Sequence, residues 1–378
     1  MKFVFLIASF NAFFFAILLF QKKHKALHDK ILMFWLLYLG LFIGSYAFYS
    51  HELFTQFQLL SISFTSLFLL HSAFLFFYIS ALISPKNSFY KIKLIHFVPF
   101  ALFNLYLLII SFFPDISGQI RLDYAQLPDS PPLLFLFFLI VTLLSGPIYF
   151  AISIRLFKKL DIDIFNNFSS SEEMDLVWLR KLVYIFGIIW TALIIITVIH
   201  HIFNLFSMVF CTDGLFLSLS VFVILIGYFG LKQKVIFSST IENEHVFVIE
   251  PQIKYASSRL TEAEASEYVE KLNHFMVAEK PYLNPNLTLH ELASELEISA
   301  HYLSQIINEK FNLNFFDYIN QYRVEEVKIK ISNPKFENYS LLGIAFDSGF
   351  NSKSAFNRIF KKFTNQTPSQ YKSQILKI

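Results

Sequence analysis

From residue 1 to residue 231 the chain consists of long apolar runs separated by short polar loops. Seven of these runs approach the ~20 residues that a helix needs to cross a hydrocarbon core of about 30 Å. The predicted spans are residues 3–20, 31–49, 59–83, 94–113, 133–155, 183–206 and 213–231. The pattern therefore predicts a seven-helix transmembrane bundle over residues 1–231.

The rest of the chain has apolar residues at helical spacing between polar ones. Residues 232–260 read as a linker, and a helical domain is predicted over 261–378. Within it, two pairs of short helices, at 288–308 and 340–363, are each joined by a tight turn, which is typical of a helix-turn-helix unit. The predicted fold is all-α throughout, with two such units in tandem.

The second helix of each unit has an apolar side and a polar side. The apolar side is predicted to carry Leu303, Ile306 and Ile307 in the first unit and Phe356, Ile359, Phe360 and Phe363 in the second. The polar side carries His301, Ser304, Gln305 and Asn308 in the first and Lys353, Ser354, Asn357, Arg358 and Lys361 in the second. In the preceding helix of the second unit, the buried side is predicted to be Leu342, Ala345 and Phe346.

Composition supports a division into unlike parts. Hydrophobic residues make up 55% of the 378 positions and charged residues only 16%, whereas a soluble domain carries about 25% charged residues. The chain is therefore too apolar to form a single soluble globule. Its one cysteine excludes an intrachain disulfide.

The loops between the predicted spans alternate in charge. One side of the bundle would carry 14 Lys and Arg residues, and the other only Lys2 and Arg121. Because basic loops stay in the cytoplasm, the N-terminus is predicted outside and the helical domain inside the cell.

Charge within the helical domain suits a nucleic acid. Residues 328–378 contain nine Lys and Arg against two Asp and Glu, whereas 232–309 contain six against twelve. Arg and Lys bind phosphates and guanine edges, and Asn and Ser bind bases or backbone. Two such helices on a rigid connector are expected to enter successive major grooves, about 34 Å apart.

Other candidate chemistry is sparse. Metal-ligand residue types gather near the predicted outer ends of the spans, but their spacing matches no known metal site, so polar anchoring at the interface is the favoured explanation. These residues are His51, His200, His201, Cys211 and Asp213. His71, in mid-span, is expected to hydrogen-bond to a neighbouring helix, and Gly40 with Gly44 to pack within the bundle. No hydrolase or nucleotide-binding motif is present, so neither an enzyme nor a cofactor is expected.

The stretch 285–372 closely resembles the DNA-binding domain of the AraC/XylS family of transcription regulators. The resemblance is carried by IAFDSGFNSKSAFNRIFKKFTNQTPSQYK, residues 344–372. Asn365 stands where the family often has Gly before Thr-Pro, and Glu297 where it often has a turn Gly. The resemblance implies base contacts from His301, Ser304 and Gln305 in the first unit. In the second unit it implies them from Lys353, Ser354, Asn357 and Arg358.

The function expected is that of a membrane-anchored, sequence-specific regulator in a bacterial inner membrane, similar to membrane-embedded variants of the family. Its partners would be double-stranded DNA, the lipid bilayer and an unidentified small-molecule or membrane signal, and a homodimer is compatible with this reading. The alternative is a membrane transporter or channel whose cytoplasmic tail has a regulatory role. Paired broken helices with mid-membrane charges would favour that alternative.

Overall fold

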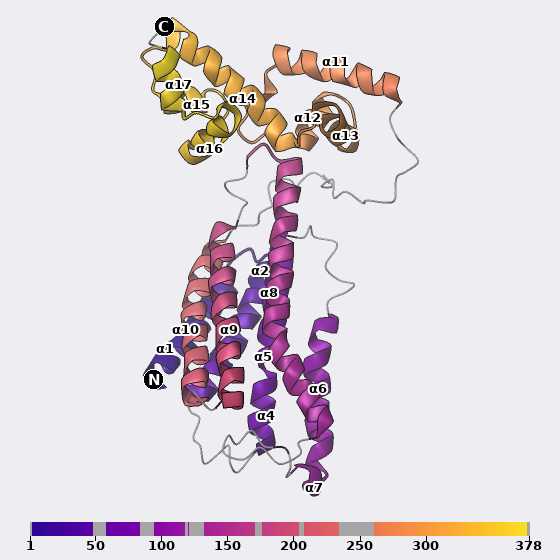
Figure 1. Ribbon diagram of the computed structural model, residues 1–378, viewed down its shortest axis with the longest axis vertical. Helices are drawn as coiled ribbons and strands as arrows, with labels where there is room; N and C mark the ends of the chain where they lie inside the picture. Colours follow the sequence, from indigo (N-terminus) through magenta and orange to yellow (C-terminus); the bar gives the residue numbers. More distant parts are fainter. Residues whose placement is uncertain are drawn as a thin grey trace. The chain divides into compact units, whose positions relative to one another are not determined.

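The computed structural model describes residues 2–47, 58–83, 94–117, 120, 132–170, 176–203, 208–233 and 261–375. Over these residues the fold is all-helical and contains no strand (Figure 1), as the sequence predicts. The chain divides into two compact units. One comprises residues 1–158 with 176–237, and the other residues 159–175 with 238–378. Most of the predicted linker, residues 234–260, lies outside the described residues.

The first unit is built from apolar helices. They are α1 (Lys2–Gln21), α2 (Leu27–Ala47), α4 (Gln58–Ser66), α5 (Phe68–Ile83), η1 (Leu94–Phe97), α6 (Val98–Ser111), α7 (Pro114–Ser117), α8 (Leu133–Asn167), α9 (Val177–Phe203) and α10 (Met208–Lys232). Among the residues that the structure describes, six helices are long and apolar enough to cross a membrane, and the predicted fourth span is a shorter apolar helix, Ile95–Ser111.

Two of the predicted spans differ in form from the expectation. The third contains a break between α4 and α5, next to Leu67. The fifth was expected to end at residue 155, but α8 continues to Asn167 and takes in the charged sequence after it. Residues between 156 and 167 retain apolar side chains at helical spacing, of which Phe157, Leu160 and Ile164 are buried. Helical periodicity therefore continued past the point where hydropathy fell.

The pair Gly40 and Gly44 packs against α1, as predicted for an intrabundle contact. A Cβ atom on Gly40 would come within 3.0 Å of the Phe13 ring, and one on Gly44 within 2.7 Å of Ser9 Oγ. Ser9 Oγ also donates a hydrogen bond of 2.7 Å to the Gly40 carbonyl. Small residues thus allow α1 and α2 to approach closely and to satisfy a buried hydroxyl.

His71 makes the interhelical hydrogen bond that was predicted for it. Its Nδ1 accepts from Trp35 Nε1 of α2 at 3.3 Å, and its ring stacks on Trp190 of α9 with 5.1 Å between centroids. The buried imidazole joins three helices through one polar contact and one aromatic contact, which is a packing role.

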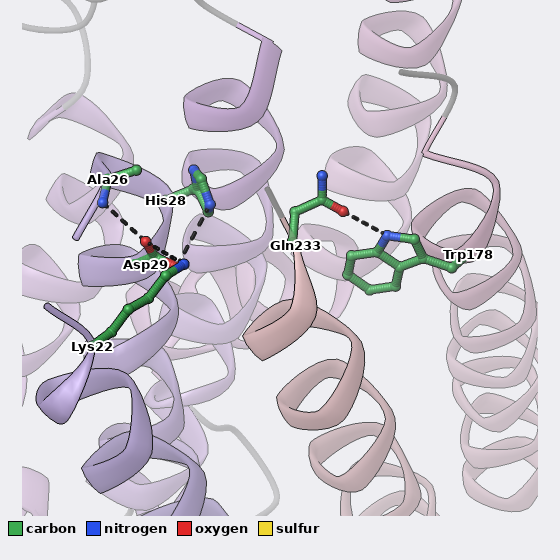
Figure 2. A network of polar contacts seen from close by, with 6 residues as sticks. All are labelled: Lys22, Ala26, His28, Asp29, Trp178 and Gln233. Atoms are coloured by element: carbon green, nitrogen blue, oxygen red, sulfur yellow. Dashed lines mark hydrogen bonds and ion pairs between the residues drawn. The ribbon is translucent and has the colours of Figure 1, made fainter. Parts of the chain in front are cut away.

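A second polar cluster lies where α1 meets α2 (Figure 2). Asp29 is 1% exposed and accepts two hydrogen bonds from Lys22 Nζ, at 2.8 and 2.9 Å, and one from the Ala26 backbone N–H at 2.9 Å. Trp178 Nε1 of α9 donates to Gln233 Oε1 at 2.8 Å, just after the end of α10. These contacts fasten helix ends by satisfying polar groups that would otherwise be buried alone.

The second unit contains a further set of helices. They are α11 (Glu262–Ala278), η3 (Pro281–Leu283), α12 (Leu289–Glu295), α13 (Ala300–Phe311), α14 (Phe315–Ser332), η4 (Pro334–Phe336), α15 (Leu341–Phe346), α16 (Lys353–Thr364) and α17 (Pro368–Ile375). Thr261 and Glu264 form a capping box at the start of α11. The residues predicted to be buried in α13 are buried, as are Phe356, Ile359 and Phe360 of α16.

Helix α14 is shared by the two hydrophobic cores of this unit. In Figure 1 it runs between α12 and α13 on one side and α15 and α16 on the other. Phe315, Tyr318 and Ile319 belong to the core with α11, α12 and α13. Phe316, Val324 and other α14 residues belong to the core with α15 and α16. A single helix with apolar residues on opposite sides therefore fixes the two halves relative to each other.

The prediction for the first helix of the second helix-turn-helix unit was only partly right. Of the three residues expected inside, Ala345 is buried, Leu342 is half-buried and Phe346 is 47% exposed. Ile344 is buried beside Ala345 instead. Helix α15 is only six residues long, so a small rotation decides which apolar residues face the core.

Candidate nucleic-acid interface

The first helix-turn-helix unit consists of α12, a short turn and α13. Thr288 caps α12 and forms a capping box with Glu291, and Ser299 caps α13 through the Tyr302 N–H. Glu297 lies in the turn with φ +57°. This left-handed conformation is the reason that a glycine would suit the position.

The second unit repeats this plan with α15 and α16. Ser340 caps α15, and Ser352 caps α16 by accepting from the Ala355 N–H. Gly349 turns the chain with φ +90°. Asn365, which stands where the family often has Gly, ends α16 with φ +58°, the left-handed conformation that Gly or Asn often takes at a helix end.

The four polar residues predicted on α13 lie at one side of the helix, with unequal exposure. His301 and Asn308 are exposed, whereas Ser304 and Gln305 are half-buried. Asn308 Nδ2 lies 3.4 Å from Ser304 Oγ, and Gln305 Nε2 donates to Glu309 Oε1 at 3.1 Å. This surface offers neutral donors and acceptors and no cation among the predicted positions.

The five residues predicted on α16 are all exposed: Lys353, Ser354, Asn357, Arg358 and Lys361. Behind them the helix buries a continuous apolar side, so its polar side is available to a partner. Lys362 Nζ forms an ion pair of 2.6 Å with Asp317 of α14, which fastens α16 to the shared helix. The predicted face of α16 thus carries three cations, in contrast to α13.

The sequence reasoning missed Arg323, the central polar residue of this unit. Arg323 is 2% exposed, and it was passed over as part of the connecting helix. A signal was present, because Ile319 and Val327 lie four residues before and after it on the same side of α14. A basic residue within a buried apolar stripe requires an internal partner.

All five N–H donors of the Arg323 guanidinium are used. Nε donates to the Tyr282 carbonyl at 2.8 Å, and Nη2 to the Asn284 carbonyl at 2.8 Å. Nη1 donates to Asn320 Oδ1 at 3.2 Å and to the Ser169 carbonyl at 2.8 Å, and Nη2 also to Ser169 Oγ at 2.9 Å. Burial lowers the pKa of Arg323 to about 9, so the group is cationic at neutral pH.

A buried carboxylate lies one turn further along α14. Glu326 Oε2 accepts from Lys280 Nζ at 3.0 Å and from Tyr282 Oη at 3.2 Å, and Lys330 Nζ lies 3.6 Å from Oε1. Burial acts to raise the pKa of Glu326, but the hydrogen bonds and charges of Lys280 and Lys330 outweigh it and lower that pKa. Burial, with the nearby Glu326 charge, raises the pKa of Tyr282.

Of the five candidate metal ligands, only the side chain of Asp213 is described. His51 lies outside the described residues, as do the side chains of His200, His201 and Cys211. Asp213 Oδ1 accepts a hydrogen bond of 2.6 Å from Tyr46 Oη. The described side chains include no group of three His, Cys, Asp or Glu residues arranged to hold a metal ion.

Comparison with known proteins finds likeness in the second unit. A family model described as a helix-turn-helix domain matches residues 292–374. Over 91 residues, the chain is 32% identical to an "Uncharacterized HTH-type transcriptional regulator" of Staphylococcus aureus, covering 24% of this chain and 12% of that protein. Over 90 residues, it is 30% identical to the Msm operon regulatory protein of Streptococcus mutans, covering 24% of this chain and 31% of that protein.

A solved structure of a protein from Listeria innocua is 28% identical to this chain. The match covers 28% of this chain and 95% of the Listeria chain, at a TM-score of 0.25. The chain spans well under two thirds of the length of either regulator it matches. Residues 292–374 are a helix-turn-helix domain of the AraC type.

Proposed function

We propose that this protein is a membrane-anchored transcription regulator that binds duplex DNA through α13 and α16. The observation that carries the proposal is the pair of helix-turn-helix units built on one connecting helix, α14. Each unit turns a polar helix side outward, and shared packing on α14 restrains the distance between those sides. Such an arrangement suits two neighbouring major grooves.

Base contacts are proposed for the residues named from the sequence. Arg358 is suited to the O6 and N7 acceptors of guanine, and Asn357 to adenine. Lys353 and Lys361 are suited to phosphates on either side of the groove. On α13, Gln305 and His301 supply polar contacts without a Lys or Arg, so the first unit would contribute mainly sequence preference.

The bundle is proposed to span a lipid bilayer. Large apolar side chains remain on its surface, among them Phe10, Leu41 and Ile188, which are 69%, 67% and 63% exposed. Apolar surface on this scale needs a nonaqueous neighbour. The bias of Lys and Arg between alternate loops supports seven spans, an outer N-terminus and a cytoplasmic second unit in a bacterial inner membrane.

The bundle would receive an external or membrane signal. An effector shifts a protein between states only if it binds them with different affinity. We therefore propose two states of the bundle that hold the DNA-binding units differently, within one chain or within a homodimer.

The test begins with selection of duplexes from a random pool by the full chain in lipid nanodiscs. We expect an enriched sequence with two half-sites about one helical turn apart. Arg358→Ala should weaken binding to it by about 1–3 kcal/mol, because a bidentate base contact is lost. The control is Lys335→Ala, which removes an exposed charge from η4, outside the proposed surface. A pool without enrichment, or an Arg358→Ala variant that binds like the control, would contradict the proposal.

A further inference from the structure

The end of α8 belongs to the same compact unit as the helix-turn-helix domain. Helix α8 begins in the first compact unit, but residues 159–175 belong to the second. We propose that residues 165–170, here named the α8 clasp, hold the two helix-turn-helix units at one spacing and transmit changes in the bundle to them. The inference rests on the proposed function and assigns its regulation to the loop after the predicted fifth span rather than to the linker at 232–260.

The α8 clasp contacts the first helix-turn-helix unit at the start of α12. Phe168 forms an isolated antiparallel bridge with Thr288, the residue that caps α12. The Ser169 N–H donates to the Leu287 carbonyl at 3.1 Å. The clasp is thus hydrogen-bonded by backbone groups to the segment that positions the first unit.

The clasp also contacts the second helix-turn-helix unit. Asn351 Nδ2 donates to Ser170 Oγ at 2.7 Å, one residue before Ser352 caps α16. The Phe165 ring meets the Phe316 ring edge-on, with 5.1 Å between centroids, and packs on the core of this unit. Six residues of α8 and its extension therefore reach both units.

Between these contacts lies the buried guanidinium of Arg323. Ser169, itself 1% exposed, accepts two of its five hydrogen bonds. The Ser169 carbonyl also accepts from Asn320 Nδ2 at 3.1 Å. If the clasp departed, a buried cation would lose two acceptors and Asn320 one, which is costly unless water replaces them.

Arg323 connects the clasp to both units because two of its remaining donors bind the segment that leads into α12, at Tyr282 and Asn284, and because it lies beside the turn of the second unit. Nε binds the Tyr282 carbonyl, and a Cβ on Gly349, in the turn of the second unit, would lie 2.2 Å from that oxygen and 3.0 Å from Nε. The turn of the second unit, the segment that leads into the first unit and Ser169 thus meet at one side chain. Docking and undocking are expected to be all-or-none, as a switching element requires.

Helix continuity supplies the route for a signal. A shift or rotation of α8 displaces its last turn as a rigid rod, in the manner of sliding helices in other switching proteins. In the docked state the spacing of α13 and α16 is fixed, and in the undocked state it is relaxed. The signal would therefore control how much variation in the distance between DNA half-sites the protein accepts.

The docked contact can be tested without DNA. In a Cys211→Ser background, the full chain in membranes would carry Ser170→Cys together with Asn351→Cys. Mild oxidation should give an intramolecular disulfide in most molecules, because the two side chains touch. The controls are each single cysteine and the pair Ser170→Cys with Ser369→Cys, the latter replacing an exposed serine of α17. Cross-linking no greater than in the Ser369 pair overturns the inference.

The effect on DNA is tested with the duplex that the full chain selects and with versions carrying one or two extra base pairs between half-sites. Wild type should lose at least about tenfold in affinity on insertion. Phe165→Ala, and separately the milder Ser170→Ala, should reduce that loss of affinity to less than about threefold. Binding by these variants should still depend on the base sequence of each half-site. The control Ile162→Ala changes a 59% exposed residue of α8 and should behave as wild type.

A merely structural role for the clasp predicts a different pattern. It would weaken binding to all duplexes alike, and that result overturns the inference. The disulfide variant provides rescue, since oxidation should restore discrimination in a Phe165→Ala background. If wild type selects no DNA sequence, the proposed function is overturned, and so is the role of the α8 clasp in setting half-site spacing. Selection without the Ser170–Asn351 cross-link overturns only the clasp.

Discussion

At the scale of single residues, a few backbone positions decide how the helix-turn-helix units are built. Glu297, Gly349 and Asn365 each take a positive φ, where the chain must turn or stop. The three positions differ in whether the surrounding structure has room for a side chain. Glu297 and Asn365 bear one already, whereas Gly349 faces the Tyr282 carbonyl at a distance that leaves no room for a Cβ atom.

Gly349→Ala should therefore destabilise the second unit. The left-handed conformation costs an alanine about 1–2 kcal/mol, and relief of the overlap with the Tyr282 carbonyl adds ~1–3 kcal/mol. Hydrogen exchange of residues 341–375 in the full chain measures the free energy of unfolding. The control is Gly343→Ala, at a helical position, which should stay within about 1 kcal/mol of wild type. If the two variants show equal hydrogen-exchange protection, the prediction is wrong and the turn at residue 349 accommodates a Cβ atom.

These residue-level features divide into predictable and unpredictable ones. Caps such as Ser299 and Ser352, and the turn at Gly349, can be predicted from sequence because they depend on neighbours three or four residues away. The contacts of Arg323 with Ser169 did not, because 154 residues separate them. Only the three-dimensional fold brings together groups so distant, and a serine in a charged loop carries no sign of its partner.

At the scale of elements, α14 connects everything in the second unit. It supplies apolar residues to both cores and polar groups to the segment before α12. The sequence predicted a rigid connector between the two units, but not that one helix would serve two cores. The short helix α15 shows the limit of pattern reasoning, since its exposed Phe346 was expected inside.

The carboxylate of Glu326 makes the attachment of α14 to η3 depend on pH. Because Lys280 and Lys330 lower the pKa of Glu326 from its ordinary value of 4.5, the pairing stabilises the folded state above that value. The stabilisation is lost as pH falls through the lowered pKa. Hydrogen exchange of residues 280–290, corrected for intrinsic rates, should show protection that falls below about pH 4.5 in wild type.

Glu326→Gln should flatten this pH dependence, because the amide cannot titrate. The matched control is Glu325→Gln, since Glu325 is the neighbouring, exposed carboxylate of α14. That control should retain the wild-type slope. A wild-type slope in Glu326→Gln would show that another group carries the acid sensitivity.

At the scale of the whole molecule, the chain joins an apolar bundle to an AraC-type helix-turn-helix domain. The apolar helices could be predicted from hydropathy, because length and composition alone identify a candidate membrane span. The extent of α8 could not, since the helix outlasts its apolar stretch and its end joins the second unit. That continuation gives the proposed regulator a route from its membrane part to its DNA-binding part.

The central claim is that one protein is held in the membrane while it reads specific DNA. The most direct test is to cross-link DNA to the full chain in living cells, isolate the membrane fraction, recover the protein and sequence the attached DNA. The account predicts a few discrete promoter sites in that fraction, lost on replacing Lys353 and Arg358 together by Ala. DNA no different from the genomic background would contradict it.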